Sequence, residues 1–204
     1  MKIAKLTAAL LLSLGSTLSQ AAVFTENFNG FTADQLNWNP AGANGWVVGP
    51  TANDTVDLIG QGGDFDLLPG NGRYVDLDGS TGSSGVLRNF VDLIAGTQYT
   101  LSFWLAGNQR LNQGTESVNV HFGGVNQTFN LTSYLDPFNT FSLIFTPTAT
   151  NRYSFGFTTN SNDNVGALLD NVSVTAVPEP ETYALMLAGL GLIGFSARRR
   201  KTQA

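Results

Sequence analysis

The stretch Tyr99-Thr-Leu-Ser-Phe-Trp-Leu-Ala106 decides the fold class of this 204-residue chain. Every second residue from Tyr99 to Leu105 is large and apolar, whereas Trp104 falls in the other set, with a threonine, a serine and an alanine. Successive side chains of a β-strand point to opposite faces of the sheet. The stretch therefore predicts a strand with one face in a hydrophobic core, and it places Trp104 on the opposite face.

The same alternation recurs on both sides of this strand, between turn-forming glycine, asparagine and aspartate residues. Between residues 22 and 176, no apolar stripe has the period of an amphipathic helix. About ten short strands bounded by turns predict an all-β fold, an antiparallel β-sandwich of the jelly-roll type. The other predicted strands cover residues 23–28, 46–48, 55–59, 74–77, 86–90, 117–122, 125–130, 141–145, 153–157 and 169–174.

The N-terminal residues have the layout of a secretory signal peptide. Lys2 and Lys5 precede an apolar run over residues 6–18, and the small residues Ser19 and Ala21 follow it. We therefore expect export, with a signal peptide at 1–21 and a β-sandwich domain at 22–176. A domain of about 155 residues is large enough to bury a hydrophobic core.

The C-terminal residues 177–204 combine three unlike features. Val177-Pro-Glu-Pro180 is followed by the nearly uncharged residues 183–197 and then by a basic cluster. A helix of about fifteen residues rises only some 22 Å, less than the roughly 30 Å hydrocarbon core of a membrane. The basic cluster favours the cytoplasmic side. This length is marginal for a permanent anchor. The features therefore predict an apolar transmembrane helix that stops export only temporarily and holds the protein as an inner-membrane intermediate.

In this order, the three features resemble the PEP-CTERM sorting signal of Gram-negative bacteria. The resemblance implies that a membrane-embedded exosortase recognises the Pro-Glu-Pro sequence and removes the tail. The domain would then reach the outer surface or an extracellular polysaccharide matrix, such as that of a biofilm. A plain single-span anchor is the alternative. The sorting residues that the resemblance identifies are Pro178, Glu179, Pro180, Arg198, Arg199 and Arg200.

Charge and cysteine content exclude several function classes for the domain. The chain has ten Lys and Arg and fifteen Asp and Glu residues, of which the two end segments hold six and two, so the domain keeps four against thirteen. A net charge of −9 disfavours binding to nucleic acids and to anionic membranes. Because cysteine is absent, disulfides, thiol catalysis and thiolate metal sites are excluded.

A second resemblance covers most of the domain. The sequences Asn71-Gly-Arg-Tyr-Val-Asp-Leu-Asp-Gly79, Ala95-Gly-Thr-Gln-Tyr-Thr-Leu-Ser-Phe103 and Leu168-Leu-Asp-Asn-Val-Ser-Val174 resemble the galactose-binding-like jelly rolls used as carbohydrate-binding modules.

This resemblance implies a structural calcium ion held by Asp170, Glu26 and Asn27. The all-oxygen donor set suits calcium. Two alternatives remain open for Asp170: it caps a turn, or it pairs with Arg152. A second, looser cation site would use Asp76 and Asp78, which share one strand face and repel each other unless a cation or Arg73 lies between them. The alternative, which we expect for this pair, is a solvated strand edge.

Sugar binding requires an exposed aromatic ring beside hydrogen-bonding side chains. Trp104 is the leading candidate for this ring, because it is out of phase with the core residues of its strand. The alternative is that it packs beneath a loop. Trp38 lies in loop-like surroundings and is a further candidate, whereas Trp46 is expected in the core. The predicted glycan-binding residues are Trp104, Asn108, Arg110 and Tyr134.

The sequence does not indicate an enzyme. His121, the only histidine, falls on the polar side of its strand and is expected to be a solvated or edge residue. Glycoside hydrolysis requires two carboxylates at a defined separation. The domain's two glutamates, Glu26 and Glu116, lie outside the Glu-x-Asp-x-x-Glu arrangement of jelly-roll glucanases. A structural or adhesive exopolysaccharide protein and a specific carbohydrate-binding module remain open, with a glycan hydrolase as the weaker alternative.

Overall fold

The structure of the protein is a computed structural model that describes residues 22–32, 34–159, 161, 163–178 and 186–194. The predicted signal peptide and five of the sorting residues lie outside the described residues. These five are Glu179, Pro180, Arg198, Arg199 and Arg200.

Strands make up most of the regular secondary structure of the described chain. A short 3-10 turn, η1 (Ala43–Gly45), lies between the second and third of them. The strands are β1 (Ala22–Glu26), β2 (Gln35–Trp38), β3 (Val47–Gly49), β4 (Val56–Gly60), β5 (Arg73–Asp76), β6 (Val86–Leu93), β7 (Tyr99–Ala106), β8 (Ser117–Phe122), β9 (Val125–Asn130), β10 (Asn139–Phe145), β11 (Asn151–Thr159) and β12 (Leu168–Ala176).

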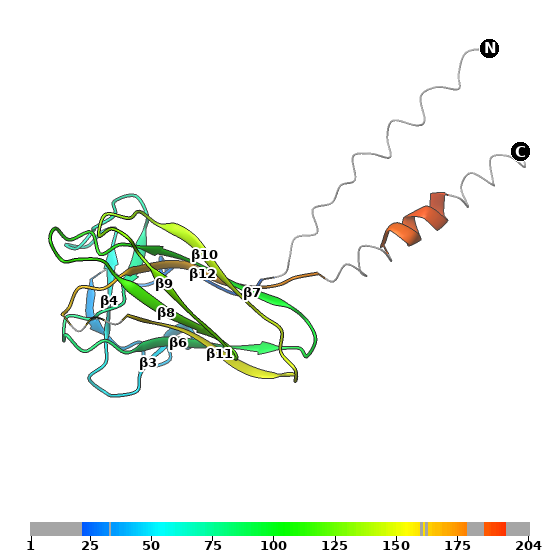
Figure 1. Ribbon diagram of the computed structural model, residues 1–204, viewed down its shortest axis with the longest axis horizontal. Helices are drawn as coiled ribbons and strands as arrows, with labels where there is room; N and C mark the ends of the chain where they lie inside the picture. The colour runs from blue at the N-terminus through cyan, green and yellow to red at the C-terminus, as the bar shows by residue number, and fades with distance from the viewer. Residues whose placement is uncertain (1–21, 33, 160, 162, 179–185, 195–204) are drawn as a thin grey trace, which may run out of the picture.

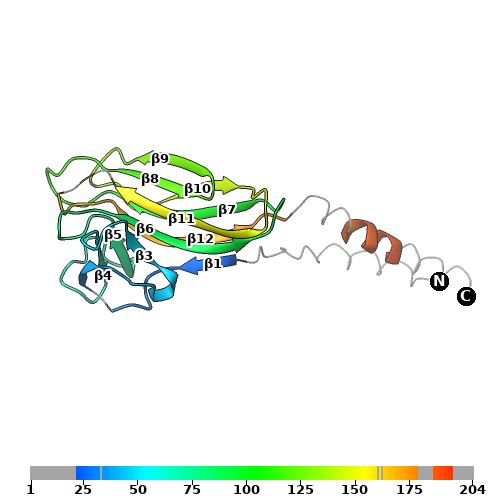
Figure 2. The ribbon, with the colours of Figure 1, turned by 90° about the horizontal axis from the view of Figure 1, so that it is seen from below.

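Two antiparallel sheets form the layers of a sandwich (Figures 1 and 2). Among the described residues, the larger sheet has the order β10-β7-β12-β5-β4-β2, and β1 pairs with β12. The smaller sheet has the order β3-β6-β11-β8-β9. The predicted antiparallel β-sandwich is confirmed.

β7 lies inside the larger sheet, between β10 and β12. Its residues Leu101, Phe103 and Leu105 are fully buried, as their alternation predicts. Trp104 points to the outer face, where its register partners are Asp170 of β12 and Thr140 of β10. The long central strand thus fixes the core and positions one aromatic ring outside it.

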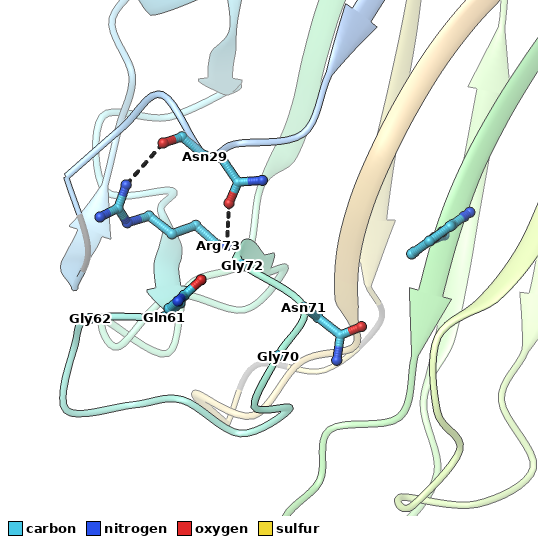
Figure 3. Close-up of a pocket in the computed structure, with 8 residues that line it drawn as sticks. Asn29, Gln61, Gly62, Gly70, Asn71, Gly72 and Arg73 are labelled. Carbon is cyan, nitrogen blue, oxygen red and sulfur yellow. Dashed lines mark hydrogen bonds between the residues drawn. The ribbon is translucent and has the colours of Figure 1, made fainter.

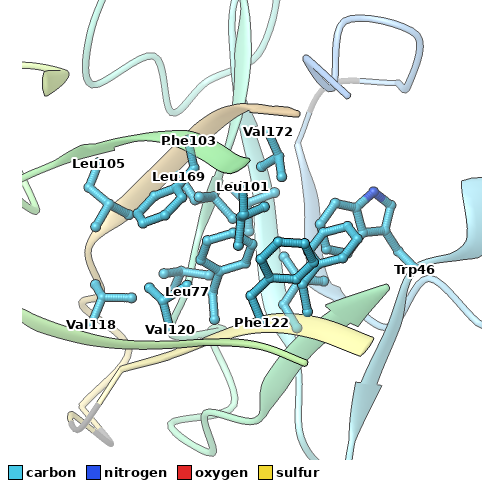
Figure 4. Packing of buried hydrophobic residues seen from close by; sticks show 14 of the residues in the cluster. Trp46, Leu77, Leu101, Phe103, Leu105, Val118, Val120, Phe122, Leu169 and Val172 are labelled. Atoms are coloured by element: carbon cyan, nitrogen blue, oxygen red, sulfur yellow. The ribbon is translucent and has the colours of Figure 1, made fainter. Parts of the chain in front are cut away.

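The core between the sheets is rich in aromatic rings, as Figure 4 shows. Phe103 and Phe157, from opposite sheets, meet edge to face with ring centroids 5.1 Å apart. Trp46 is fully buried, as predicted. Trp38 is also a core residue, only 7% exposed and 5.0 Å from the ring of Phe31, so its predicted loop-like exposure is wrong. The reason is β2, which turns this side chain inward.

Both ends of the domain lie at the same end of the larger sheet, where β1 pairs with β12. Ala22 at the start of β1 pairs with Thr175 near the end of β12. Beyond β12, the Val177 N–H donates to the Gln98 carbonyl at 2.8 Å. Residues 186–194 are helical, and within the described part of the chain no helix is long and apolar enough to cross a membrane.

Candidate functional site

Trp104 lies at the common wall of two hollows on the outer face of the larger sheet. Its side chain is half-buried, and its ring centroid is 6.2 Å from that of Phe138. The larger hollow has a volume of about 790 Å³ and the smaller one about 430 Å³. Trp104 therefore offers one aromatic surface to both.

Polar loop residues line the larger hollow (Figure 3). They come from the segment before β2, from the turn after β4 and from the turn that enters β5. The lining residues are Asn29, Gln61, Gly62, Gly70, Asn71, Gly72, Arg73 and Trp104.

Asn29 and Arg73 hold two of these segments together. The Arg73 N–H donates to Asn29 Oδ1 at 2.8 Å, and Arg73 Nη1 donates to the Asn29 carbonyl at 3.0 Å (Figure 3). Gly72 has a φ of +74°, and a Cβ there would lie 2.3 Å from Asn29 Oδ1. Only glycine permits this close approach of the two loops.

The smaller hollow lies where β1 meets β12. The register of β12 against β7 shifts between Asp170 and Ser173, which opens the sheet surface beside Trp104. The lining residues are Thr25, Glu26, Asn27, Ser102, Trp104, Asn171, Val172 and Ser173.

The predicted calcium residues lie beside this smaller hollow. Asp170 is buried, and its Oδ1 accepts the Asn171 N–H at 2.6 Å. Burial raises the pKa of Asp170 to about 7; the Asn171 N–H opposes this rise and the charge of Glu26 adds to it. Glu26 accepts the Phe28 N–H at 2.8 Å. Two acidic side chains thus approach one another here, with the exposed Asn27 beside them.

The alternative that Asp170 pairs with Arg152 is wrong. The Arg152 guanidinium lies over the Phe90 ring, 5.0 Å from its centroid, and the two residues form no salt bridge within the described part of the chain. The described part of the chain holds no cluster of three or more acidic, histidine or cysteine side chains suited to a metal ion. Any cation beside Asp170 would therefore need amide or backbone oxygens in addition to the two carboxylates.

The predicted glycan residues do not come together around Trp104. Asn108 is fully buried; its Nδ2 donates to Glu116 Oε1 at 2.9 Å and its Oδ1 accepts the Arg110 N–H at 2.9 Å. Tyr134 is half-buried, and it lines neither hollow beside Trp104. Asn108 therefore supports its loop from within.

Arg110 lines a third hollow, of about 380 Å³, together with Asp57 and Phe65. Its Nη1 donates to Asp76 Oδ2 at 2.8 Å, in the one salt bridge among the described residues. Burial raises the pKa of Asp76 to about 7, although Arg110 opposes the rise. Arg110 is therefore committed to a structural ion pair.

Asp76 and Asp78 are both fully buried, so the predicted solvated strand edge is wrong. Loops cover this part of the outer face, and both carboxylates accept hydrogen bonds from them. The Gly166 N–H donates to Asp76 Oδ1 at 2.9 Å, and the Asp163 N–H donates to Asp78 Oδ2 at 3.0 Å. The two side chains tie the loop before β12 to the sheet.

His121 lies on the other sheet, half-buried, with Nε2 3.2 Å from Ser154 Oγ. Burial lowers the pKa of His121, and the charge of Arg88 adds to this effect. The residue is less solvated than its strand position predicts.

Sequence reasoning missed most of the polar residues that do surround Trp104. Asn29, Gln61, Asn71 and Arg73 come from three loops with no common spacing. The sole signal was the Asn-Gly-Arg turn at residues 71–73, where glycine adjoins two hydrogen-bonding side chains.

The fold is similar to that of several solved carbohydrate-binding proteins, at low sequence identity. The xylan-binding domain of a Paenibacillus barcinonensis xylanase aligns over 78% of this chain and 97% of its own, with a TM-score of 0.49 and 10% identity. A family 16 carbohydrate-binding module aligns over 69% of this chain and 99% of its own, with a TM-score of 0.43 and 18% identity.

A larger structure with the same kind of similarity is a Clostridium thermocellum endo-xylanase, with carbohydrate-binding and glycoside hydrolase modules, complexed with xylohexaose. It aligns over 78% of this chain, with a TM-score of 0.49 and 14% identity, and this chain spans only 29% of its length. No curated protein matches the sequence.

Residues 176–201 match the family model of the PEP-CTERM protein-sorting motif. The match confirms the predicted sorting signal at the C-terminus. The motif implies a secreted surface protein that an exosortase processes.

Proposed function

We propose that the β-sandwich is a carbohydrate-binding module with its glycan site at Trp104. The protein is sorted through its C-terminal motif, by way of an inner-membrane intermediate, and binds exopolysaccharide at the outer surface or in the extracellular matrix. One observation carries the proposal: a half-buried tryptophan forms the common wall of two hollows whose other lining residues are mostly polar.

The chemistry of the two hollows supports a sugar ligand. The C–H faces of a sugar ring stack on an aromatic ring, and its hydroxyls require donors and acceptors close by. Amide side chains of Asn29, Gln61 and Asn71 line one side of Trp104, and Asn171 and Ser173 line the other. Polar side chains on both sides suit a chain of several sugar units that crosses the ring.

The first test is a glycan array probed with the secreted, processed protein and with its Trp104→Ala variant. We expect one preferred glycan class, bound at least about 30-fold more weakly by the variant, since a central aromatic contact contributes about 2 kcal/mol or more. Phe90→Ala is the matched control, because it removes an exposed ring from the opposite sheet. Equal binding by Trp104→Ala and wild type would contradict the proposed site.

Diffuse, weak binding to many glycans would instead favour a structural or adhesive role in the matrix. Release of reducing ends from the bound polysaccharide would favour the hydrolase alternative. Both outcomes differ from the expected single preference.

We also propose a structural calcium ion held by Asp170, Glu26 and Asn27. Two close carboxylates with no cation between them repel each other, and a calcium ion would neutralise both. The pKa of Asp170 lies above its unfolded value, so its contribution to stability is present at low pH and is lost as the pH rises from about 4 to 7. The ion would therefore matter most at neutral and alkaline pH.

Accordingly, calcium at a hundredfold excess over its Kd should stabilise the protein at pH 8 by about 2.7 kcal/mol relative to chelator. For a domain of this size the melting temperature should rise by about 5–10 °C. Asp170→Asn should abolish this rise, whereas Asp163→Asn, at an exposed position, should retain it. Identical melting curves with calcium and with chelator would rule the ion out.

A further inference from the structure

Among the residues that the structure describes, Arg73 is the only charged one that lines the larger hollow. The domain as a whole carries a net charge of −9, and its only basic residues are four arginines. No acidic side chain within the described ranges lines this hollow. One wall of the proposed glycan site thus carries a positive charge in an otherwise acidic domain.

The Arg73 guanidinium has hydrogen-bond acceptors for only one of its sides. Nη1 donates to the backbone carbonyls of Asn29 and Phe31. In contrast, Nε is buried without a hydrogen-bond partner, and Nη2 donates to no group within the described residues. A Cβ on Gly62, which also lines the hollow, would lie 3.9 Å from Nη2.

Arg88 Nε is also buried without a hydrogen-bond partner, but Arg88 belongs to β6 of the other sheet and lines neither hollow beside Trp104. The other two arginines of the domain are engaged by side chains. Arg110 forms an ion pair with Asp76, and Arg152 lies over the Phe90 ring. Arg73 forms no ion pair with any described residue. A buried, unpartnered N–H costs free energy unless a ligand or water accepts its hydrogen bond.

We propose that the larger hollow selects a sugar unit that carries an oxyanion, either the carboxylate of a uronic acid or a sulfate ester. Nε–H and Nη2–H lie on the same edge of a guanidinium and together bind two oxygens of one oxyanion. The sugar ring stacks on Trp104 while its anionic group meets Arg73. This inference rests on the proposed glycan site and names its ligand class.

The experiment compares polymers that differ only in charge, bound to the secreted, processed protein. Polygalacturonate is paired with its methyl ester, and dextran sulfate is paired with dextran. We expect one charged polymer to bind about 10- to 100-fold more tightly than its neutral partner, the range for charge-assisted hydrogen bonds. The pair that shows the preference identifies the carboxylate or the sulfate.

Two variants locate the preference. Arg73→Gln should lose the preference and bind the charged and the neutral polymer with equal affinity. Because Arg73 also bonds to the Asn29 loop, the melting curve of this variant, and not its affinity for the neutral polymer, reports that the fold is intact. Arg88→Gln is the matched control, because it changes the net charge equally from a strand of the other sheet. It should keep the full preference.

Equal binding of charged and neutral polymers by the wild type would overturn the inference and leave the Trp104 site standing. A preference that survives in Arg73→Gln would overturn it as well. If wild type and Trp104→Ala bind all four polymers and the array glycans alike, the proposed function itself fails.

Discussion

Replacement of Pro178 and Glu179 with alanine is expected to leave the C-terminal tail on the whole population of molecules. The family match covers residues 176–201 and includes both positions. β12 ends at Ala176, and the next residue, Val177, still donates to the sheet. Pro178 has no N–H to extend this ladder, so the motif begins where the sandwich ends. Intact mass of the secreted and membrane fractions measures the result.

Glu181→Ala provides the control for this experiment, because it removes a glutamate two residues beyond Glu179 and outside the Pro-Glu-Pro sequence. It should be processed normally. If the Pro178 and Glu179 double variant had the wild-type mass and location, the sorting motif would not direct processing.

Loss of Arg110 is expected to cause the largest change in stability. Asp76 is fully buried, and Arg110 is the cation that neutralises it, at 2.8 Å. Removal of one partner of a buried ion pair costs about 3–5 kcal/mol. Because the Arg110 side chain is 28% exposed, we expect the lower end of this range for Arg110→Met, about 3 kcal/mol, and a melting temperature lower by about 10 °C.

The destabilisation should depend on pH in a defined direction. Burial raises the pKa of Asp76 to about 7, above its unfolded value, so this carboxyl destabilises the fold increasingly as the pH rises from about 4 to 7. Without Arg110 the pKa rises further. Wild type and variant should therefore differ most above pH 7, where the wild-type carboxylate is ionised and paired.

Two further variants separate the ion pair from general effects of charge. Arg152→Met removes an arginine that stacks on Phe90 at the surface, and it should cost no more than about 1 kcal/mol. Asp76→Asn combined with Arg110→Met should recover much of the lost stability. A shift of less than 2 °C for Arg110→Met at pH 8 would show that Asp76 does not depend on its partner.

Alternation predicted the central part of the fold because one face of each long strand is buried. The strand at 99–106 appears with the predicted bounds, and so do those at 117–122 and 125–130. β2 was missed, since its four residues include Asn37 with a φ of +53° and show no alternation. β1 ends at Glu26 rather than residue 28, because Phe28 also has a positive φ.

The site was harder to predict, because loops build it. The alternation placed Trp104 outside the core. In contrast, the sequence around Asn108 did not indicate that this side chain would be buried by its hydrogen bond to Glu116. From the sequence, Asp76 is expected at the surface. In the structure, the loop before β12 and Arg110 cover it. Burial of such polar groups depends on contacts with residues that are distant in the sequence. The hydrophobic periodicity of a short segment cannot predict such contacts.

The central claim is that a glycan stacks on Trp104, and accessibility of this ring to a quencher tests it most directly. Trp38 and Trp46 are buried, so Trp104 is the accessible one of the three tryptophans. Acrylamide quenching of tryptophan fluorescence should therefore report on Trp104. The account predicts that the glycan preferred on the array reduces quenching of the processed protein, and that this protection is absent in Trp104→Ala. Unchanged quenching at a saturating concentration of that glycan would contradict the account, because the sugar would then bind elsewhere.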